Sequence, residues 1–260
     1  MKAIILAAGR GSRMGKLTDD QPKCFTQLAG RTLLDWQISA LCAAGIEEIA
    51  IVRGYRKELL PDSLRHFDND RWQQSNMVVS LRCASEWLSN SPCIVTYSDI
   101  VFAPETIQLL MASPAAIAIS YNTEWRALWE ARFDDPLADA ETFAVETDGR
   151  IADIGRRARS MDEIQGQYMG LLKFEPKGWE RVETYLKTLA SAELDRLDMT
   201  GLLQRLISNQ VNIYGVPVPG MWYEIDTESD WSVCEREISA TGKGHWLFER
   251  ASGGRAHDSH

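Results

Sequence analysis

The sequence predicts an α/β protein with a Rossmann-like, doubly wound mixed sheet and a small inserted substrate lobe. Three observations support this fold class. The chain opens on a short apolar segment, residues 3–7, that runs directly into a glycine turn. Apolar segments suited to strands then alternate with helical patterns as far as residue 122. From residue 123 the pattern changes to mixed aromatic and charged residues with short strand-like pieces.

The elements of the first half follow from periodicity. Residues 32–48 have a helical pattern that ends at Gly45, and residues 49–55 form a predicted strand that stops at Gly54. Strand, helix and strand in this order imply a right-handed parallel crossover. The alternation continues with a helix (76–88), a strand (91–102), a helix (103–113) and a strand (115–122).

The second half contains fewer clear elements. "TDGR" at 147–150 is typical of a hairpin turn, and residues 178–189 and 198–209 are amphipathic helices. Residues 211–231 return as a strand with a loop, and a final helix follows. We therefore expect a single domain over residues 1–250, made of a core (1–122) and a lobe with returning strands (123–220), and a disordered tail at 251–260.

Composition narrows the class of protein. The 260 residues are 45% hydrophobic and 25% charged, as in an ordinary globular protein. The net charge of −9 without a long basic run argues against a nucleic acid or a membrane surface as partner. No apolar run approaches the roughly 20 residues of a membrane span. Five widely spaced cysteines without a C-x-x-C motif argue against disulfides and structural zinc, and favour the cytoplasm. The composition leaves open whether the protein forms a homodimer.

The first glycines, Gly9 and Gly11, indicate a phosphate-binding turn. A Walker A loop is excluded, because five residues separate Gly9 from Gly15 and the following Lys16 precedes a leucine rather than a serine or threonine. The dinucleotide fingerprint G-x-G-x-x-G fails at Met14, so an NAD(P)-dependent oxidoreductase is a weaker alternative. The segment also carries the cations Arg10, Arg13, Lys16 and Lys23. Four cations in one segment suit the binding of a triphosphate better than that of a dinucleotide.

Four charged residues are the candidate catalytic and metal-binding groups: Arg13, Lys23, Asp99 and Asp226. Asp99 follows an apolar strand and should lie at the carboxyl edge of the sheet, where α/β proteins bind ligands. Asp226 lies in "YEID", where a later strand can reach the same edge. Two carboxylates at a triphosphate are natural ligands for Mg²⁺. As alternatives, either acid could be a helix cap, and either cation could be a solvated surface charge.

The segment "LAAGRGSRMGKLTDDQPKCF", residues 6–25, resembles the nucleotidyltransferase signature L-A-A-G-x-G-x-R-(M/L)…P-K. Residues 37–55, 69–81 and 223–231 are similar to bacterial phosphocholine-type and phosphonate-type cytidylyltransferases. The middle segments, 125–143 and 167–174, are more similar to members that act on phosphonates or phosphoramidates. One departure is Tyr97-Ser98-Asp99, where many sugar-type relatives carry glycine before the aspartate.

The resemblance implies a role for each matching residue. Arg13 would neutralise the β- and γ-phosphates, Lys23 would hold the α-phosphate, and Asp99 and Asp226 would bind Mg²⁺. The nucleotide-binding residues would be Ala7, Ala8, Gly9, Gly11, Ser12, Asn76 and Ser80. The reaction implied is transfer of CMP from CTP to a small phosphonate or phosphorylated metabolite, with release of pyrophosphate. Alternatives are a sugar-1-phosphate nucleotidyltransferase, a phosphocholine cytidylyltransferase and a non-catalytic nucleotide sensor.

The acceptor has to be predicted from the second half. The candidate substrate-binding residues are Trp125, Trp129, Arg132, Glu141, Tyr168, Lys173 and Glu224. The tryptophans could form an aromatic cage for a quaternary ammonium, or could simply pack the lobe, as the i, i+4 spacing favours. The cations suit an anionic acceptor, and Glu141 or Glu163 could recognise an amine. An acceptor phosphonate is already anionic near neutral pH, so no general base is needed to activate it. The scarcity of histidine, with four residues in the chain, is consistent with this chemistry.

Overall fold

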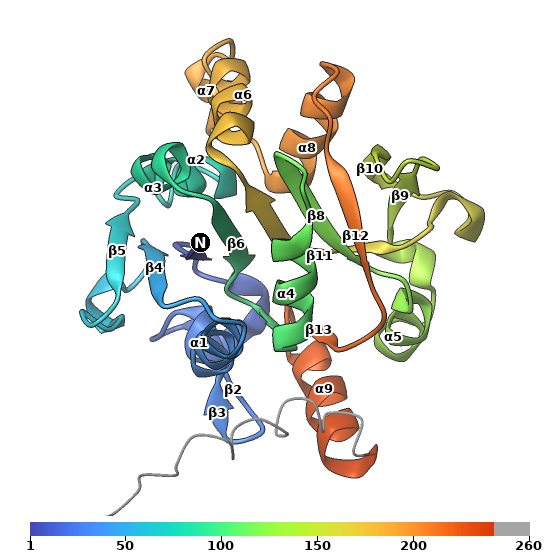
Figure 1. Ribbon diagram of the computed structural model, residues 1–260. Helices are drawn as coiled ribbons and strands as arrows, with labels where there is room; N and C mark the ends of the chain where they lie inside the picture. The colour runs from blue at the N-terminus through green and yellow to red at the C-terminus, as the bar shows by residue number, and fades with distance from the viewer. Residues whose placement is uncertain (242–260) are drawn as a thin grey trace, which may run out of the picture.

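The computed structural model describes residues 1–241, with side chains to Ile238, and shows a central sheet with helices on both faces (Figure 1). The strand order is β12-β8-β11-β6-β1-β4-β5. The strands of this sheet are β1 (Lys2–Ala7), β4 (Glu48–Arg53), β5 (Arg65–Asp68), β6 (Cys93–Tyr97), β8 (Ile117–Asn122), β11 (Gln167–Phe174) and β12 (Tyr214–Val218). The disordered tail predicted at residues 251–260 lies outside the residues that the structure describes.

The sheet is mixed, as the sequence predicts. Strand β1 pairs in parallel with both β4 and β6, and β4 pairs in parallel with β5. Strand β11 is antiparallel to its neighbours β6 and β8, while β12 returns parallel to β8. The parallel strands β1 and β6 therefore end at the same edge of the sheet, so the glycine turn after β1 and Asp99 after β6 lie at that edge.

Short pairs and helices complete the fold. The strand pairs are β2 (Gln27–Leu28) with β3 (Arg31–Thr32), β7 (Ile100–Phe102) with β13 (Trp222–Glu224), and β9 (Glu141–Val145) with β10 (Ile151–Arg157). The helices are α1 (Leu33–Ala43), α2 (Met77–Cys83), α3 (Ser85–Asn90), α4 (Pro104–Ala112), α5 (Trp125–Arg132), α6 (Pro176–Leu186), α7 (Ser191–Leu194), α8 (Met199–Ser208) and α9 (Glu228–Thr241). Two 3₁₀ helices, η1 (Ser12–Thr18) and η2 (Lys23–Phe25), lie in the glycine-rich segment. Among the described residues, no helix has the length and apolar character needed to cross a bilayer.

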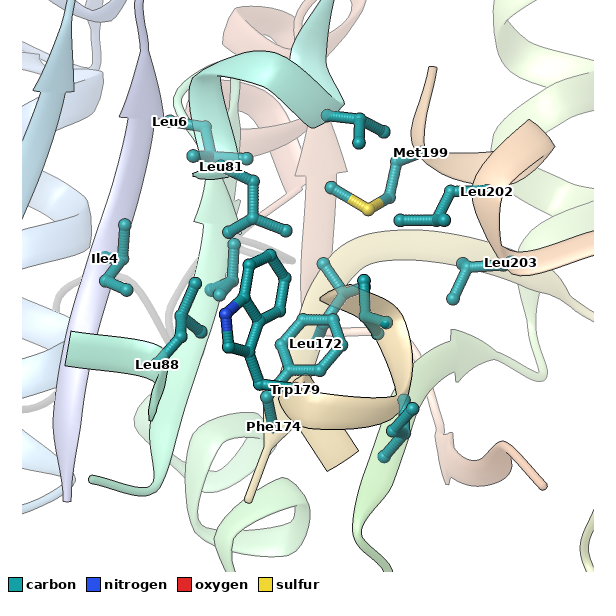
Figure 2. Close-up of a cluster of buried hydrophobic side chains, with 14 of the residues drawn as sticks. Ile4, Leu6, Leu81, Leu88, Leu172, Phe174, Trp179, Met199, Leu202 and Leu203 are labelled. Carbon is teal, nitrogen blue, oxygen red and sulfur yellow. The ribbon is translucent and has the colours of Figure 1, made fainter. Parts of the chain in front are cut away.

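Alternate residues of β1 face two separate hydrophobic cores, because successive side chains of a strand point to opposite faces. Ile4 and Leu6 join the core under α2, α3, α6 and α8, which Figure 2 shows around the indole of Trp179. Trp179 packs edge to face on Phe174, with ring centroids 5.7 Å apart. The other β1 side chains, those of Ala3, Ile5 and Ala7, join a second core with α1, α4 and α5.

The structure differs from the predicted elements at three places. The strand predicted at 91–102 is broken after Tyr97 into β6 and β7, because the chain turns at Ser98 and Asp99. The helix predicted at 76–88 is two short helices that meet at Ala84. Strand β5 was not predicted, since its sequence RHFD carries three polar residues and only Phe67 is buried.

The second half of the chain contributes both to the central sheet and to the elements outside it. Strands β11 and β12 lie inside the central sheet, next to β6 and β8, so that the sheet itself spans both halves. Outside the sheet stand α5 and the β9–β10 hairpin, whose turn contains Gly149 at φ 85° as "TDGR" predicts. The hairpin packs against α8 through Ile151 and Ile154 in the first core.

Candidate active site

The glycine-rich segment is fixed to the rest of the protein rather than being a free loop. After β1 the chain turns at Gly11, which has a left-handed φ of 70°. The Thr18 hydroxyl donates to the Gly11 carbonyl at 2.9 Å and is fully buried. Met14 is also buried, in a third core that includes β13 and α9 residues. The segment therefore reaches the C-terminal part of the described chain, from which the second candidate metal ligand comes.

Lys23 crosses directly behind the glycine turn. Pro22 precedes it at φ −59°, and only 7% of the lysine side chain is exposed. A Cβ at Gly11 would lie 2.7 Å from the Lys23 Cδ and 2.9 Å from its Cβ, closer than atoms in contact approach. The missing side chain at Gly11 is therefore what lets the lysine pass.

Replacing Gly11 by alanine is expected to reduce turnover about 10- to 100-fold, because the lysine would have to shift to admit the new Cβ. The left-handed backbone should also lower the free energy of unfolding by about 1–2 kcal/mol. Gly30 is a matched control, since it has φ 78° but no atom within 4 Å of its ideal Cβ. Gly30→Ala should lose similar stability, measured by urea unfolding, and keep its turnover. Equal turnover losses in the two variants would show that backbone strain alone is responsible.

Asp99 and Asp226 are brought together by the pairing of β7 with β13. Glu224 pairs with Ile100, and the Ile225 amide donates to the Asp99 carbonyl at 2.8 Å. Each aspartate therefore lies at the end of one of two paired strands. The buried Gln37 of α1 supports the same turn, as its amide donates to the carbonyls of Tyr97 and Ile100 at 2.9 and 2.7 Å.

Lys23 joins the two acids. Its Nζ lies 2.8 Å from Asp99 Oδ2 and 2.7 Å from Asp226 Oδ1. Arg13 forms an ion pair with the other oxygen of Asp226, while 74% of the arginine side chain is exposed. Burial alone would lower the pKa of Lys23, but the two carboxylates outweigh it and raise that pKa above its ordinary value. The lysine is therefore a fixed cation at neutral pH.

The two acids fit a magnesium site. Asp99 Oδ1 is buried and has no hydrogen-bond partner among the described residues, so this oxygen is available to a metal ion. The described residues contain no cluster of three or more metal-ligating side chains. Two carboxylates are nevertheless the usual protein contribution to Mg²⁺, which completes its shell with water and substrate phosphates.

Neither aspartate is a helix cap. The N-cap of α4 is Ala103, four residues after Asp99. At the start of α9, the Thr227 hydroxyl accepts from the Asp230 amide, and Asp230 accepts from the amides of Asp226 and Thr227. This capping arrangement instead fixes the backbone of Asp226. The structure also excludes a solvated position for Lys23, whereas Arg13 is largely solvated.

A cavity of about 250 Å³ opens beside this cluster and is the second part of the candidate site. Arg13 and Asp226 lie in its wall, which connects the cavity to the cluster. Five of the seven predicted substrate-binding residues also line it: Trp129, Arg132, Glu141, Tyr168 and Glu224. The sequence interpretation missed the lining residues Tyr97, Asp139, Thr142, Gln167, Asp198 and Thr200, for which no motif gave a signal.

The site combines a glycine turn, a buried lysine between two strand-end acids, and an adjoining cavity. Residues 3–206 match the MobA-like NTP transferase domain. The chain belongs to this nucleotidyltransferase family. It is therefore an enzyme of the transferase class.

Similar proteins narrow the comparison to cytidylyltransferases. The chain is 37% identical over 250 residues to the CTP:phosphoglutamine cytidylyltransferase of Campylobacter jejuni, covering 90% of this chain and 98% of that protein. It is 26% identical over 270 residues to the CMP-5'-(3-aminopropyl)phosphonate synthase of Streptomyces rubellomurinus, covering 98% of this chain but only 41% of that longer protein. The CTP:phosphocholine cytidylyltransferase structure from Streptococcus pneumoniae shares the fold, with a TM-score of 0.66 and 21% identity, covering 91% of this chain and 98% of that chain.

Arg132 of this nucleotidyltransferase has a different environment from the one expected for a substrate-binding cation. Its side chain is 3% exposed, with Nε 2.7 Å from Asp230 and a terminal nitrogen 3.2 Å from Glu224. Burial would lower the pKa of Arg132, yet the two acids raise it. Burial raises the pKa of Glu224 to about 7, against the opposing effect of Arg132. Arg132 thus already has carboxylate partners, and it links α5 to β13 and α9.

Two predicted substrate-binding residues lie away from the cavity wall. Lys173 is buried at the opposite part of β11, where its ammonium donates to the Ser113 carbonyl and pairs with Glu175 at 2.9 Å. A buried lysine needs such partners, so this prediction is corrected. Trp125 is buried in the second core and packs edge to face on Trp129. The packing interpretation of the tryptophans is the one that the structure supports.

Only some of the predicted nucleotide-binding residues lie close to one another in the structure. Ala7 and Ala8 are buried at the end of β1, and Gly9 and Ser12 are exposed beside the turn at Gly11. Ser80 lies on α2 and Asn76 immediately before it, and neither residue is part of the cavity lining. The Asn76 side chain caps this helix at the Met77 amide, and the buried Ser80 hydroxyl accepts from Asn69.

Proposed function

We propose that this enzyme transfers CMP from CTP to a small phosphonate or phosphorylated acceptor, with Mg²⁺ and with release of pyrophosphate. The observation that supports it most is the position of Lys23 between Asp99 and Asp226 at the glycine turn. The similar proteins named above use CTP with acceptors that carry phosphorus. The glycine turn, Lys23 and the two acids lie at one edge of the sheet.

The reaction needs charge stabilisation more than proton transfer. An acceptor oxygen that is already anionic attacks the α-phosphorus of CTP, the bond from that phosphorus to the bridging oxygen breaks, and pyrophosphate leaves with the electron pair. Lys23 would stabilise the charge on the α-phosphate, and its burial keeps it positioned for this. Mg²⁺ held by Asp99 and Asp226 would supply Lewis-acid stabilisation of the phosphate oxygens.

Arg13 is suited to the leaving group. Its side chain is largely exposed, lies in the cavity wall and forms an ion pair with Asp226. Only the arginine half of this ion pair is accessible, since 74% of the Arg13 side chain but 13% of the Asp226 side chain is exposed. Arg13 would therefore turn to the β- and γ-phosphates as Mg²⁺ takes its place at Asp226. The backbone around Ala8, Gly9, Gly11 and Ser12 would offer N–H groups to the same triphosphate.

Pyrophosphate release tests the proposal. Each of CTP, UTP, ATP and GTP is paired with 2-aminoethylphosphonate, phosphoglutamine, phosphocholine or glucose 1-phosphate, with Mg²⁺ or with EDTA. We expect release with CTP and a phosphonate or phosphoramidate, abolished by EDTA, and a ³¹P signal of the CMP-linked product. Preference for glucose 1-phosphate would instead favour the sugar-type alternative, and silence with every pair would overturn the proposal.

Asp226→Asn should lower turnover in this assay at least about 100-fold, because a metal ligand contributes several kcal/mol of charge stabilisation. Asp20→Asn is the matched control, since Asp20 is exposed and its 3.4 Å pair with Arg56 lies outside the cluster. If Asp226→Asn keeps wild-type turnover at saturating Mg²⁺, Asp226 is not a metal ligand.

A further inference from the structure

Most acidic side chains of the active-site cavity have a partner within the protein. Asp139 accepts from the Trp129 indole at 3.2 Å, and Asp198 accepts from the Gly201 amide at 2.8 Å. Glu224 pairs with Arg132, and Asp226 pairs with Lys23. These four acids therefore have a structural explanation in the described part of the chain.

Glu141 is different. It is the first residue of β9 and lines the cavity, yet its carboxylate makes no hydrogen bond or ion pair with the residues that the structure describes. Its backbone is held in place, because the buried Gln167 side chain donates to the Glu141 carbonyl at 2.7 Å and accepts from the Glu141 amide at 3.3 Å. The backbone of Glu141 is thus fixed at the cavity wall, while its carboxylate has no counter-charge among the residues that the structure describes.

This position is electrostatically unfavourable in the free enzyme. Burial, reinforced by Asp198 and Asp139, raises the pKa of Glu141 to about 7. Five acids and two arginines line the cavity, so the acidic side chains in its wall outnumber the basic ones. Unfavourable groups of this kind in a cavity are commonly functional, because a ligand supplies the missing interaction.

We propose that Glu141 binds a protonated amine on the acceptor and so selects acceptors that carry both a phosphorus group and an ammonium. The inference rests on the proposed cytidylyltransferase function and specifies its acceptor. Glutamine, aminopropyl and aminoethyl groups and choline, which the names of similar cytidylyltransferases and of a related synthase contain, each carry a cationic nitrogen.

The tryptophans do not form a cage for a quaternary ammonium, and Glu141 is suited to a primary one. A quaternary ammonium is bound mainly by open aromatic faces. Trp129, however, stacks on Trp222 at a centroid distance of 6.1 Å and has the Arg132 guanidinium 4.9 Å from its ring centre. Trp125 is buried outside the cavity lining. A carboxylate without a partner instead accepts hydrogen bonds, which a primary ammonium donates.

The test compares 2-aminoethylphosphonate with ethylphosphonate, which lacks only the amine. In the CTP assay, wild-type kcat/KM should be about 10- to 100-fold higher for the amine, as expected for a charge-assisted hydrogen bond. Glu141→Gln should bring this ratio close to one. Glu163→Gln is the matched control and should keep the wild-type ratio, because Glu163 is exposed, bonds to the Arg159 amide and lies outside the cavity lining.

The outcomes separate the two proposals. Equal use of both phosphonates by the wild type would overturn this inference while the cytidylyltransferase function stands. A Glu141→Gln enzyme with the wild-type ratio would exclude Glu141 as the selecting residue, and a preference for phosphocholine over the primary amine would overturn the choice of ammonium. Failure of every acceptor would overturn the proposed function and the inference together.

Discussion

Lys23→Ala should lower turnover about 100- to 1000-fold, the usual effect of removing one fixed group that stabilises transition-state charge. The buried ammonium lies within 2.8 Å of both candidate metal ligands, so its removal takes a fixed positive charge out of the centre of the site. Turnover is measured as pyrophosphate release at saturating CTP, acceptor and Mg²⁺. Lys187→Ala, on the exposed surface after α6, should match the wild type.

A second readout separates a catalytic effect from unfolding. Without Lys23, Asp99 and Asp226 lose the cation they share, and the remaining carboxylates repel each other. Mg²⁺ then binds without displacing an ammonium, so it should raise the Tm of Lys23→Ala more than that of the wild type. A variant that is folded, responds to Mg²⁺ no more than the wild type and retains most turnover would remove Lys23 from the mechanism.

Arg132→Met should lower the free energy of unfolding by about 3–5 kcal/mol, because it leaves the buried Asp230 and the half-buried Glu224 without their cation. The change should also weaken the start of α9, since the same Asp230 accepts from the Asp226 amide. Urea unfolding at neutral pH measures the loss. Arg132→Lys should restore only part of the stability, as an ammonium cannot reproduce the planar contacts with both acids.

Arg126 is the matched control on the same helix. Its pair with Glu130 is an exposed i, i+4 interaction, with 65% and 52% of the side chains accessible. Arg126→Met should change stability by no more than about 0.5 kcal/mol. Adding Glu224→Gln and Asp230→Asn to Arg132→Met should recover stability, because no charge is then left unpaired. Similar losses for Arg126→Met and Arg132→Met would contradict the role assigned to Arg132.

The front of the active site could be predicted from sequence because its determinants are local. Gly11, Pro22 and Lys23 lie within one short segment, and the turn conformation and stiffened backbone follow from residue type. Asp99 was predicted from its position after an apolar strand, which in α/β sheets specifies the edge. The structure confirms that this segment and the two acids meet. Their roles toward CTP and Mg²⁺ stay proposals.

The substrate-binding residues were harder to predict, because the charge of a residue does not reveal whether its side chain is already paired within the protein. Arg132 and Lys173 were both interpreted as substrate cations, but Asp230, Glu175 and a backbone carbonyl occupy them. The contacts of Arg132 with Asp230 and of Lys173 with the Ser113 carbonyl join segments far apart in sequence, and periodicity carries no signal for them. Glu141 shows the converse, since the absence of a partner among the described residues becomes visible only when its neighbours are placed.

The central claim is that Lys23, Asp99 and Asp226 converge on one metal-bound triphosphate. A crystal of the enzyme with CTP and Mn²⁺, which binds the same oxygen ligands as Mg²⁺, tests it through the anomalous signal of manganese. We predict one manganese peak bound by both aspartates and a triphosphate oxygen, with Lys23 turned to the α-phosphate. Manganese bound elsewhere, with the lysine still bridging Asp99 and Asp226 beside bound CTP, would contradict the claim.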